Sequence, residues 1–341
     1  MEKKRVTITD VAREAQVSET TVSLAFKEGS RISEPTRKRI LETASRMSYF
    51  PDSAARRLRF GSGKSIGLIV TDITNPWHAT VVRSADQIVR SSGYQLIIAE
   101  SNWDAATEVD VTRNMIESRV LGLIMCFSET TEESYLLIRR SGIPHVAIDT
   151  VPPFYKGPSV LSDHLYAGSE AARHLLFCGC SRPAFFTSDP GTRRFSTFTL
   201  LEKGFLSGLR KGGIDPQSVP IIEAGLSISQ GQDAYARLRA SGIEVDCIFC
   251  VNDLCAIGAL EEAKSRGVSI GEELRVIGID NLEFSALETV SLTSFADPRQ
   301  EIMKAAANYL IESIEDEEPL DIHRKFRSRL IERKSTSRAA H

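Results

Sequence analysis

Residues 7–27 read TITDVAREAQVSETTVSLAFK and predict two short helices joined by a tight turn. Thr7 and Asp10 have the spacing of a capping box, after which small apolar residues recur on one face of a first helix. Ser18 can cap a second helix that turns Val22 inward and leaves its polar residues outside. Two helices arranged in this way are typical of proteins that place the second helix in the DNA major groove.

A third helix is expected over residues 33–47, which would close a small all-α core. Its apolar residues recur at helical spacing: Ile40, Leu41, Ala44 and Met47. A small helical bundle without a partner is the alternative. The charge distribution favours phosphate binding, because residues 1–64 carry 14 basic and 8 acidic side chains, a net +6, whereas residues 65–341 carry 28 and 37, a net −9.

The composition indicates two or three soluble domains, since the chain has 341 residues and 42% of them are hydrophobic. No stretch reads as a membrane span. The charged residues 1–5 lead into the helical pattern rather than into an apolar signal core. We therefore expect a cytoplasmic, nucleoid-associated protein.

The six cysteines predict buried thiols rather than disulfides or a metal site. Only Cys178 with Cys180 and Cys247 with Cys250 are close pairs, and each pair lies in or beside an apolar run. No histidine joins them at the spacing of a zinc finger. We expect no metal and no other cofactor.

From residue 65 onward the pattern changes to short apolar runs separated by amphipathic stretches. The runs are residues 66–70, 95–99, 122–126, 145–148, 183–186, 247–251 and 275–279. Helices such as residues 79–92 and 254–266 lie between them, each followed by a glycine suited to a left-handed cap. This alternation predicts an α/β body of parallel sheets with helices on both faces.

Polar residues follow these runs directly and are candidates for a ligand site, because open parallel sheets bind ligands at the carboxyl ends of their strands. They are Asp72 with Asn75, Pro76 and Trp77, then Asp149, Asp163, Asn252 with Asp253, and Asp280 with Asn281. For each residue alone, capping of a helix or turn is the simpler explanation. Their recurrence favours a sugar-like ligand held by carboxylates and amides, with Trp77 stacked on it.

Along the chain these motifs resemble those of the lactose-repressor (LacI/GalR) family of bacterial transcription regulators, from about residue 6 to residue 337. In the head they are Val17-Ser18, Thr21-Val22-Ser23, residues 33–37, residues 49–51 and residues 54–58. In the body they are Ile66-Gly67, Asp72 with residues 75–77, residues 142–144, Asp163 with Gly168 and residues 174–175, then residues 252–259, 278–281 and 330–336.

The resemblance implies a helix-turn-helix DNA-binding head over residues 1–50, a hinge helix and linker over residues 51–64, and an effector-binding and dimerisation core over residues 65–341. The core would have a two-subdomain, periplasmic-binding-protein-like (type I) fold. The expected N-subdomain covers about 65–163 plus 293–323, and the expected C-subdomain covers about 164–292 plus 324–341.

The function implied is that of a transcriptional regulator, expected to be a repressor. It would bind a near-palindromic double-stranded DNA operator as a homodimer under the control of a small-molecule effector, expected to be a sugar or sugar derivative. The effector can be an inducer or a corepressor, and the protein can be a repressor or an activator. The few residues after 336 carry no leucine heptads, so a dimer is expected rather than a tetramer.

The pattern and the resemblance together assign the site residues. The DNA contacts are expected at Thr7, Thr9, Ser18, Glu19, Thr20, Thr21, Ser23, Leu24, Lys27, Arg31, Ser33, Thr36, Tyr49, Ala55, Arg56 and Leu58. The effector contacts are expected at Asp72, Trp77, His78, Asp163, Arg193, Arg194, Asn252 and Asp280.

By resemblance, residues 53–59 form a hinge helix that orders on DNA, and Leu58 is the wedge that enters the minor groove at the operator centre. An apolar side chain flanked by arginines can unstack a base step while Arg56, Arg57 and Arg59 hold phosphates. A plain basic linker is the alternative.

Several residues depart from the family pattern. Gln16 occupies a turn position where many relatives carry glycine, at a cost of roughly 1 kcal/mol if its backbone is left-handed. Leu24 replaces an arginine of the lactose repressor, so a different operator is expected. Leu201 stands where relatives often carry an arginine that clamps the effector, and Arg193 or Arg194 could substitute for it. For His78 and for His164, a surface or capping role is the alternative to ligand contact.

A sugar-binding receptor without a regulatory role shares the expected body fold and is the alternative function. The basic head argues against it. An enzyme is disfavoured, because the sequence has no glycine-rich phosphate loop, no recognisable nucleophile motif and no metal motif.

Overall fold

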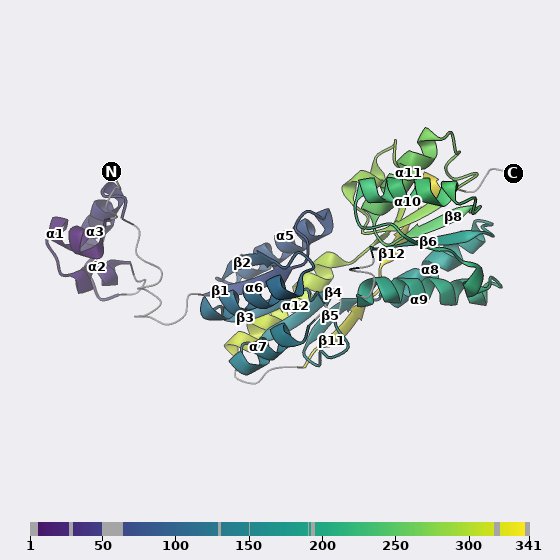
Figure 1. The fold of residues 1–341 in the computed structure, drawn as a ribbon. Coiled ribbons are helices and arrows are strands. Elements are labelled where there is room, and N and C mark those ends of the chain that lie inside the picture. The colour runs from purple at the N-terminus through teal and green to yellow at the C-terminus, as the bar shows by residue number, and fades with distance from the viewer. Residues whose placement is uncertain are drawn as a thin grey trace. The chain divides into compact units, whose positions relative to one another are not determined.

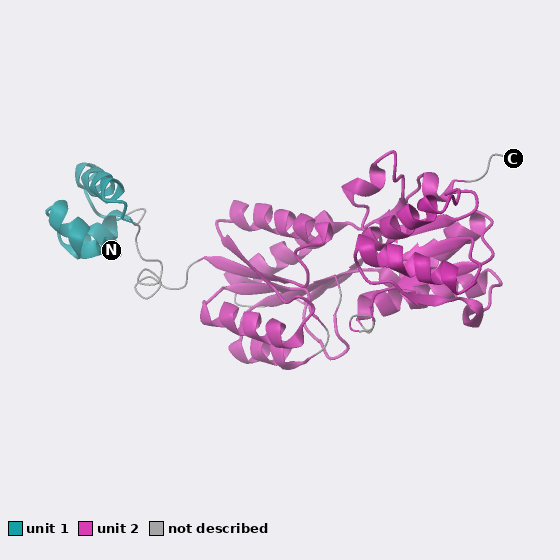
Figure 2. Ribbon diagram, turned by 45° about the horizontal axis from the view of Figure 1, so that its top comes forward, with its two compact units in different colours: residues 1–63 teal, residues 64–341 magenta. Residues whose placement is uncertain are grey.

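The computed structural model describes residues 6–26, 30–49, 64–128, 131–149, 151–189, 191, 195–316 and 321–337. The chain divides into two compact units, residues 1–63 and residues 64–341 (Figure 2). Each unit has its own hydrophobic core and is described by itself.

The first unit contains the three predicted helices, α1 (Ile8–Glu14), α2 (Glu19–Ala25) and α3 (Glu34–Arg46). The capping box is present, because the Thr7 side chain accepts a hydrogen bond from the Asp10 amide and the Asp10 carboxylate accepts one from the Thr7 amide. Their apolar faces meet in a core made of Val11, Ala12, Ala15, Val22, Ala25, Ile40 and Ala44. The all-α head is therefore confirmed.

The second unit begins with a six-stranded parallel sheet in the order β11-β5-β4-β3-β1-β2 (Figure 1). Its strands are β1 (Ser65–Val70), β2 (Gln95–Glu100), β3 (Gly122–Met125), β4 (His145–Asp149), β5 (Ser159–Ser162) and β11 (His323–Phe326). The core on one face includes residues of α5 (Pro76–Ser91) and α12 (Arg299–Glu315), and the core on the other face includes residues of α6 (Ala105–Glu117) and α7 (Glu133–Ser141). We call this sheet with its four helices the first lobe.

A second six-stranded sheet has the order β12-β10-β9-β8-β6-β7 and is parallel except for β12. Its strands are β6 (Pro183–Thr187), β7 (Ile221–Glu223), β8 (Cys247–Cys250), β9 (Arg275–Ile279), β10 (Thr293–Ala296) and β12 (Arg329–Ile331). Helices α8 (His164–Phe177) and α9 (Ser196–Lys211) cover one face, and α10 (Ile228–Ala240) and α11 (Asp253–Ser265) cover the other. We call this sheet with its helices the second lobe.

The chain passes between the lobes three times, after β5, after β10 and after β11. The second and third crossovers fall a few residues later than the expected subdomain boundaries at 293 and 324, because β10 belongs to the second sheet and β11 to the first. These strands are short, and neither contains an apolar run of the kind that predicts a buried strand.

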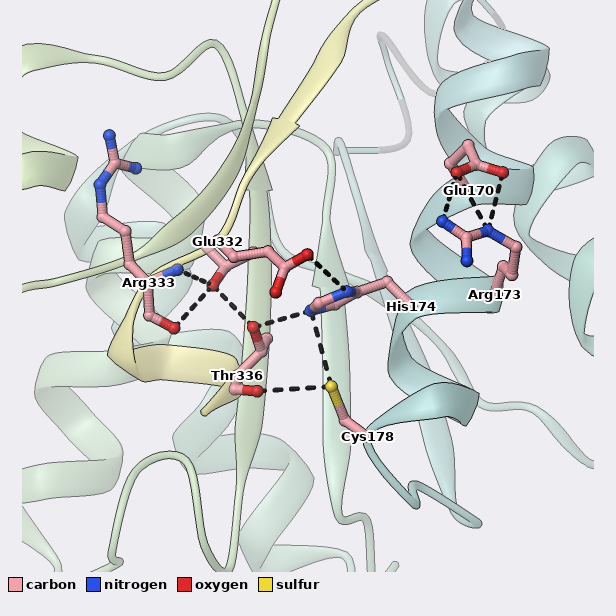
Figure 3. Close-up of polar contacts among 8 residues, drawn as sticks. Glu170, Arg173, His174, Cys178, Glu332, Arg333 and Thr336 are labelled. Carbon is pink, nitrogen blue, oxygen red and sulfur yellow. Dashed lines mark hydrogen bonds and ion pairs between the residues drawn. The ribbon is translucent and has the colours of Figure 1, made fainter. Parts of the chain in front are cut away.

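Three further short helices are present in the second unit: η1 (Pro216–Ser218), η2 (Glu283–Ala286) and η3 (Lys334–Thr336). The last of them ties the chain end to α8. His174 of α8 lies 2.9 Å from the Thr336 hydroxyl and 3.6 Å from the Cys178 sulfur, which in turn contacts the Thr336 carbonyl oxygen at 3.4 Å (Figure 3). The carboxylate of Glu332 lies 3.8 Å from the same imidazole. Burial lowers the pKa of His174, so its neutral form is favoured in this contact.

All six cysteine side chains are buried, as the sequence predicts. Among the described residues, Cys180, Asp246 and Cys247 alone place three potential metal ligands close together. The Asp246 carboxylate already accepts hydrogen bonds from the Ser181 and Arg182 amides. No helix within the described ranges combines the length and the apolar character that crossing a bilayer requires.

Candidate functional site

Helix α2 exposes a polar surface in the first unit. The hydroxyl of Ser18 caps the helix by accepting a hydrogen bond from the Thr21 amide at 3.2 Å. Val22 and Ala25 are buried, so the opposite face carries Glu19 and Thr20, both exposed, with Thr21, Ser23 and Leu24 half-buried beside them. A short helix presented in this way can place its N-terminal side chains against base edges.

One contact connects this helix to α1. The Thr9 hydroxyl donates a 2.7 Å hydrogen bond to the Glu19 carboxylate, and both side chains are exposed. The interaction orients Glu19 without burying it. A carboxylate held in this position can accept a hydrogen bond from the amino group of cytosine.

The turn between α1 and α2 contains Gln16, for which the sequence raised the question of a left-handed backbone. Gln16 has φ +52°, in the left-handed region. The amide of Val17, the next residue, donates to the Ala12 carbonyl and closes the turn.

The other head residues predicted to contact DNA fall into three groups. Thr7 is an exposed cap of α1, Ser33 and Thr36 share a 2.8 Å hydrogen bond at the start of α3, and Arg31 is exposed just before it. Tyr49 packs edge to face on Phe26 with ring centroids 6.1 Å apart. Lys27, Ala55, Arg56 and Leu58 lie outside the described residues.

A cavity lies between the two lobes of the second unit, at the carboxyl ends of their central strands. It is lined by Asn75, Trp77, His78, Trp103 and Asp149 from the first lobe, by His164, Ala167, Thr197, Phe198, Leu226, Val251, Asn252, Ile279 and Asp280 from the second, and by Asp297 and Ser328 from the crossovers. The cavity has a volume of about 50 Å³, too small for a sugar-sized molecule. The lobes must move apart to admit a sugar-sized molecule.

Three buried polar atoms around this cavity have no hydrogen-bond partner among the described residues: His78 Nδ1, Trp103 Nε1 and Thr197 Oγ1. They come from both lobes. Burying a polar group without a partner costs about 1–3 kcal/mol, and a ligand or a bound water in the cavity can supply the missing hydrogen bonds. His78 is held from its other side, since its Nε2 lies 3.0 Å from the Thr71 hydroxyl, and burial lowers its pKa.

An ion pair joins the lobes across the cavity. His164 Nε2, at the start of α8, donates to Asp149 Oδ1, at the end of β4, over 3.2 Å. Burial alone would lower the pKa of His164, but the hydrogen bond and the charge of Asp149 outweigh it, so the pKa is raised. The pairing with Asp149 therefore favours the charged form of His164.

The three crossovers meet at Asp297. Its carboxylate accepts hydrogen bonds from the Ser162 hydroxyl at 2.8 Å, from the Ser328 hydroxyl at 3.2 Å and from the Trp77 indole at 3.4 Å. Burial is the main reason that the pKa of Asp297 is raised. Asp297 therefore positions the crossovers relative to one another and to α5.

Asp280 differs from the other carboxylates of the cavity. Its side chain is 93% buried and makes no hydrogen bond or ion pair with the described residues, although the Arg299 guanidinium binds its carbonyl oxygen. Burial, and next the charge of Asp253, raise the pKa of Asp280 well above its ordinary value. The φ angle of Asp280 is +107° and that of Asp149 is +67°. Strained non-glycine residues cluster at binding sites.

Asp253 lies behind this site and is fully buried. Its carboxylate accepts hydrogen bonds from the Ser285 and Ser294 hydroxyls and from the Leu282 amide. Burial raises the pKa of Asp253 to about 6. Because these three donors already bind its carboxylate, Asp253 stabilises the segment that follows β9 and does not line the cavity.

The structure brings four of the predicted effector residues to the cavity: Trp77, His78, Asn252 and Asp280. Asp72 is instead held in its own turn by the Thr74 amide and hydroxyl, and Asp163 caps α8 through the Tyr166 amide. Neither lines the cavity. Arg193 and Arg194 lie outside the described residues.

Sequence reasoning did not assign Trp103, Thr197, Phe198 or Asp297 to the site. Asn75 and Asp149, which follow predicted strands, and His164, for which ligand contact was one alternative, do line the cavity. Asp297 follows β10, which was not predicted. Leu201 is fully buried in the core of the second lobe and does not line the cavity.

Two protein-family models match the chain. They are described as bacterial regulatory proteins of the lacI family, matching residues 7–52, and as periplasmic binding proteins and sugar binding domain of the LacI family, matching residues 63–332. The same order of domains, a short head followed by a long body, is therefore found by the family models and by the structure.

Known proteins match over almost the whole chain. Catabolite control protein A of Priestia megaterium is 30% identical over 306 residues, 89% of this chain and 91% of that protein. The HTH-type transcriptional regulator GntR of Pseudomonas aeruginosa is 30% identical over 334 residues, 97% of this chain and 96% of that protein. A crystal structure of the Lac repressor dimer bound to operator and the anti-inducer ONPF has a TM-score of 0.83 at 20% identity, covering 98% of this chain and 100% of that one. The likeness to this structure confirms the fold class predicted from the sequence.

Proposed function

Because this chain belongs to the LacI family of bacterial regulatory proteins and is a DNA-binding transcriptional regulator, we propose that it represses transcription as a homodimer on a near-palindromic operator. The head matches the model of bacterial regulatory proteins, which favours a regulator over a sugar-binding receptor without a regulatory role. The protein acts in the cytoplasm by binding, not by catalysis.

The observation that supports operator reading most directly is the exposed face of α2. Glu19 and Thr20 project from a helix whose other face is buried, and Thr9 orients Glu19. Glutamate can accept from cytosine, threonine can serve either base, and Leu24 can pack on a thymine methyl group. Two such helices in a homodimer read the two halves of a two-fold site.

The hinge helix and linker expected over residues 51–64 supply the second DNA contact in this proposal. Leu58 is the apolar wedge at the operator centre, and Arg56 holds phosphate, as proposed from the sequence. Replacing Leu58 with alanine then weakens operator binding far more than binding to random DNA, whereas Arg56→Ala mainly lowers the salt dependence. Equal losses on operator and random DNA for Leu58→Ala would rule out the wedge.

The cavity between the lobes is the effector site in this proposal, and a sugar or sugar derivative is the ligand class. The unpartnered polar atoms of His78, Trp103 and Thr197 support it, together with the aromatic rings around them. Ligand binding shifts the lobes between an open and a closed arrangement. If the two arrangements differ in DNA affinity, the ligand changes DNA binding to the extent that it binds one arrangement more tightly than the other.

Selection of the purified full chain on randomised duplex DNA tests the proposed function. We expect recovery of a site with two-fold symmetry, and a Glu19→Ala variant should alter the preference at one symmetric pair of positions. Glu42→Ala, at an exposed position on α3, is the matched control and should recover the wild-type site. Recovery of no two-fold site by the wild-type protein would overturn the proposal.

A further inference from the structure

The charges around the cavity between the lobes are unbalanced. Asp149, Asp280 and Asp297 line it, and no lysine or arginine does so among the described residues. The two histidines that line it differ, since His164 is paired with Asp149 and the lowered pKa of His78 favours its neutral form. The lining is therefore better suited to a cation than to an anion.

Two of these three carboxylates are already satisfied within the protein. Asp149 is paired with His164, and Asp297 accepts hydrogen bonds from the Ser162 and Ser328 hydroxyls and from an indole. Asp280 alone has no partner for its carboxylate among the described residues, although it is 93% buried. Arg299, whose guanidinium binds the Asp280 carbonyl oxygen, is a nearby counter-charge but does not pair with the carboxylate. A buried carboxylate without a direct partner is costly, and a neutral hydroxyl group supplies a hydrogen bond but no charge.

Aromatic side chains complete the surroundings. Trp77, Trp103 and Phe198 line the same cavity, and Trp103 stacks on Phe195 with ring centroids 5.1 Å apart. Aromatic rings attract ammonium groups through their negative faces, and this attraction is strongest where water is excluded. Carboxylate and aromatic side chains together form the usual surroundings of a bound protonated amine.

We propose that the effector carries a protonated amine, as in an amino sugar, and that Asp280 is the carboxylate that receives it. This inference rests on the proposed function, because it narrows the ligand class of the same site. It predicts that sugar acids and sugar phosphates are rejected, since their charge has the sign of the lining.

The titration of Asp280 is consistent with this assignment. Burial and the neighbouring charges of Asp253, Asp297 and Asp149 raise its pKa well above the ordinary value, whereas Arg299 opposes the shift. His164, the other charged group nearby, is already paired with Asp149. A bound ammonium group would make the ionised form of Asp280 favourable.

The chain has two tryptophans, and both line the cavity, so intrinsic fluorescence reports on binding there. The full chain is titrated with D-glucosamine, D-galactosamine and D-mannosamine, and in parallel with their N-acetyl forms, which have the same ring without the charge, and with D-gluconate. We expect a saturable change with at least one free amine, and an affinity at least tenfold lower for its N-acetyl form and for gluconate. Asp280→Asn should lose at least tenfold in affinity for that amine, and Asp233→Asn, at an exposed position on α10, should not.

Saturable binding of an N-acetyl form or of gluconate as tightly as of the amines would overturn the amine assignment and leave the effector site in place. Absence of a saturable change with all three amines would overturn it as well. Full affinity of Asp280→Asn for the amine would remove Asp280 from the contact. Failure of the proposed function is separate, because it appears as failure to recover a two-fold DNA site.

Discussion

His164 Nε2 lies 3.2 Å from Asp149 Oδ1, so that one ion pair connects the end of β4 in the first lobe to the start of α8 in the second. Both side chains are largely buried. The charge on His164 therefore affects how firmly the two lobes are held together.

The first prediction concerns the pH dependence of this pair. A histidine whose pKa is raised by folding stabilises the protein fully below its unfolded pKa, 6.5, and loses this effect as the pH rises through the folded value. Replacing His164 with glutamine keeps a donor but removes the charge, and should cost about 1–2 kcal/mol at pH 6 and little at pH 9. Urea unfolding of the full chain, followed by tryptophan fluorescence, measures the difference.

His323→Gln is the control for this experiment, since the charge of His323 serves an exposed pair with Asp321 at 3.1 Å and should contribute little. Its other ring nitrogen lies 3.1 Å from the Ser159 hydroxyl, and glutamine retains a group that can hydrogen-bond there. An equal loss for His164→Gln at both pH values would show that the charge has no role.

The second prediction concerns Asp297, where the three crossovers between the lobes meet. Asn at position 297 can accept fewer of the three hydrogen bonds that Asp297 accepts, so Asp297→Asn should destabilise the second unit by about 1–3 kcal/mol. Ser162→Ala should cost about 1 kcal/mol. Asp321→Asn, at an exposed position, should stay within about 0.5 kcal/mol of the wild type. Equal unfolding midpoints for Asp297→Asn and Asp321→Asn would contradict the role of Asp297.

The third prediction concerns the close approach of α8 and α9. A Cβ atom on Gly168 would lie 2.2 Å from the Leu201 carbonyl oxygen, and one on Gly204 would lie 2.2 Å from the Leu165 carbonyl oxygen. Gly168→Ala must therefore separate the helices and should cost about 1–3 kcal/mol or more. Leu165→Ala, at an exposed position on the same helix, is the control. Thermal unfolding checks both variants, and an unchanged melting temperature for Gly168→Ala would refute the contact.

The fourth prediction concerns operator specificity. The Thr9 hydroxyl orients the Glu19 carboxylate at 2.7 Å. Glu19→Ala should relax the preference at one base pair of each half-site by about 1–3 kcal/mol, and Thr9→Val should produce a smaller loss at the same base pair. Dissociation constants for the selected operator and its single-base variants check this. A loss at a different base pair for Thr9→Val would show that the two residues act independently.

Much of the fold could be predicted from the sequence, because long apolar runs such as residues 66–70 and strong caps such as Ser18 are local signals. The short strands β5, β7, β10, β11 and β12 could not, since they have too few apolar residues to form a run. The strand-end rule led to Asp280 and Asn252, which do line the cavity. It also led to Asp72 and Asp163, whose carboxylates are used by their own turn and helix.

Other cavity residues depend on contacts between distant segments. Asp297 is 135 positions from Ser162 along the chain, so no local pattern links them. Trp103 and Thr197 likewise line the same cavity only because the two lobes face each other. Such residues can be assigned to the cavity only when the three-dimensional arrangement of the crossovers is known.

The central claim is that a ligand between the lobes changes the affinity of the head for DNA. Its most direct test is the dissociation constant of the full chain for its selected operator, with and without the compound that gives the largest saturable change in tryptophan fluorescence. We predict a change of about 5–150-fold in the wild type and none in Asp280→Ala, which should still bind the operator. An unchanged operator affinity in the wild type at saturating ligand would contradict the claim.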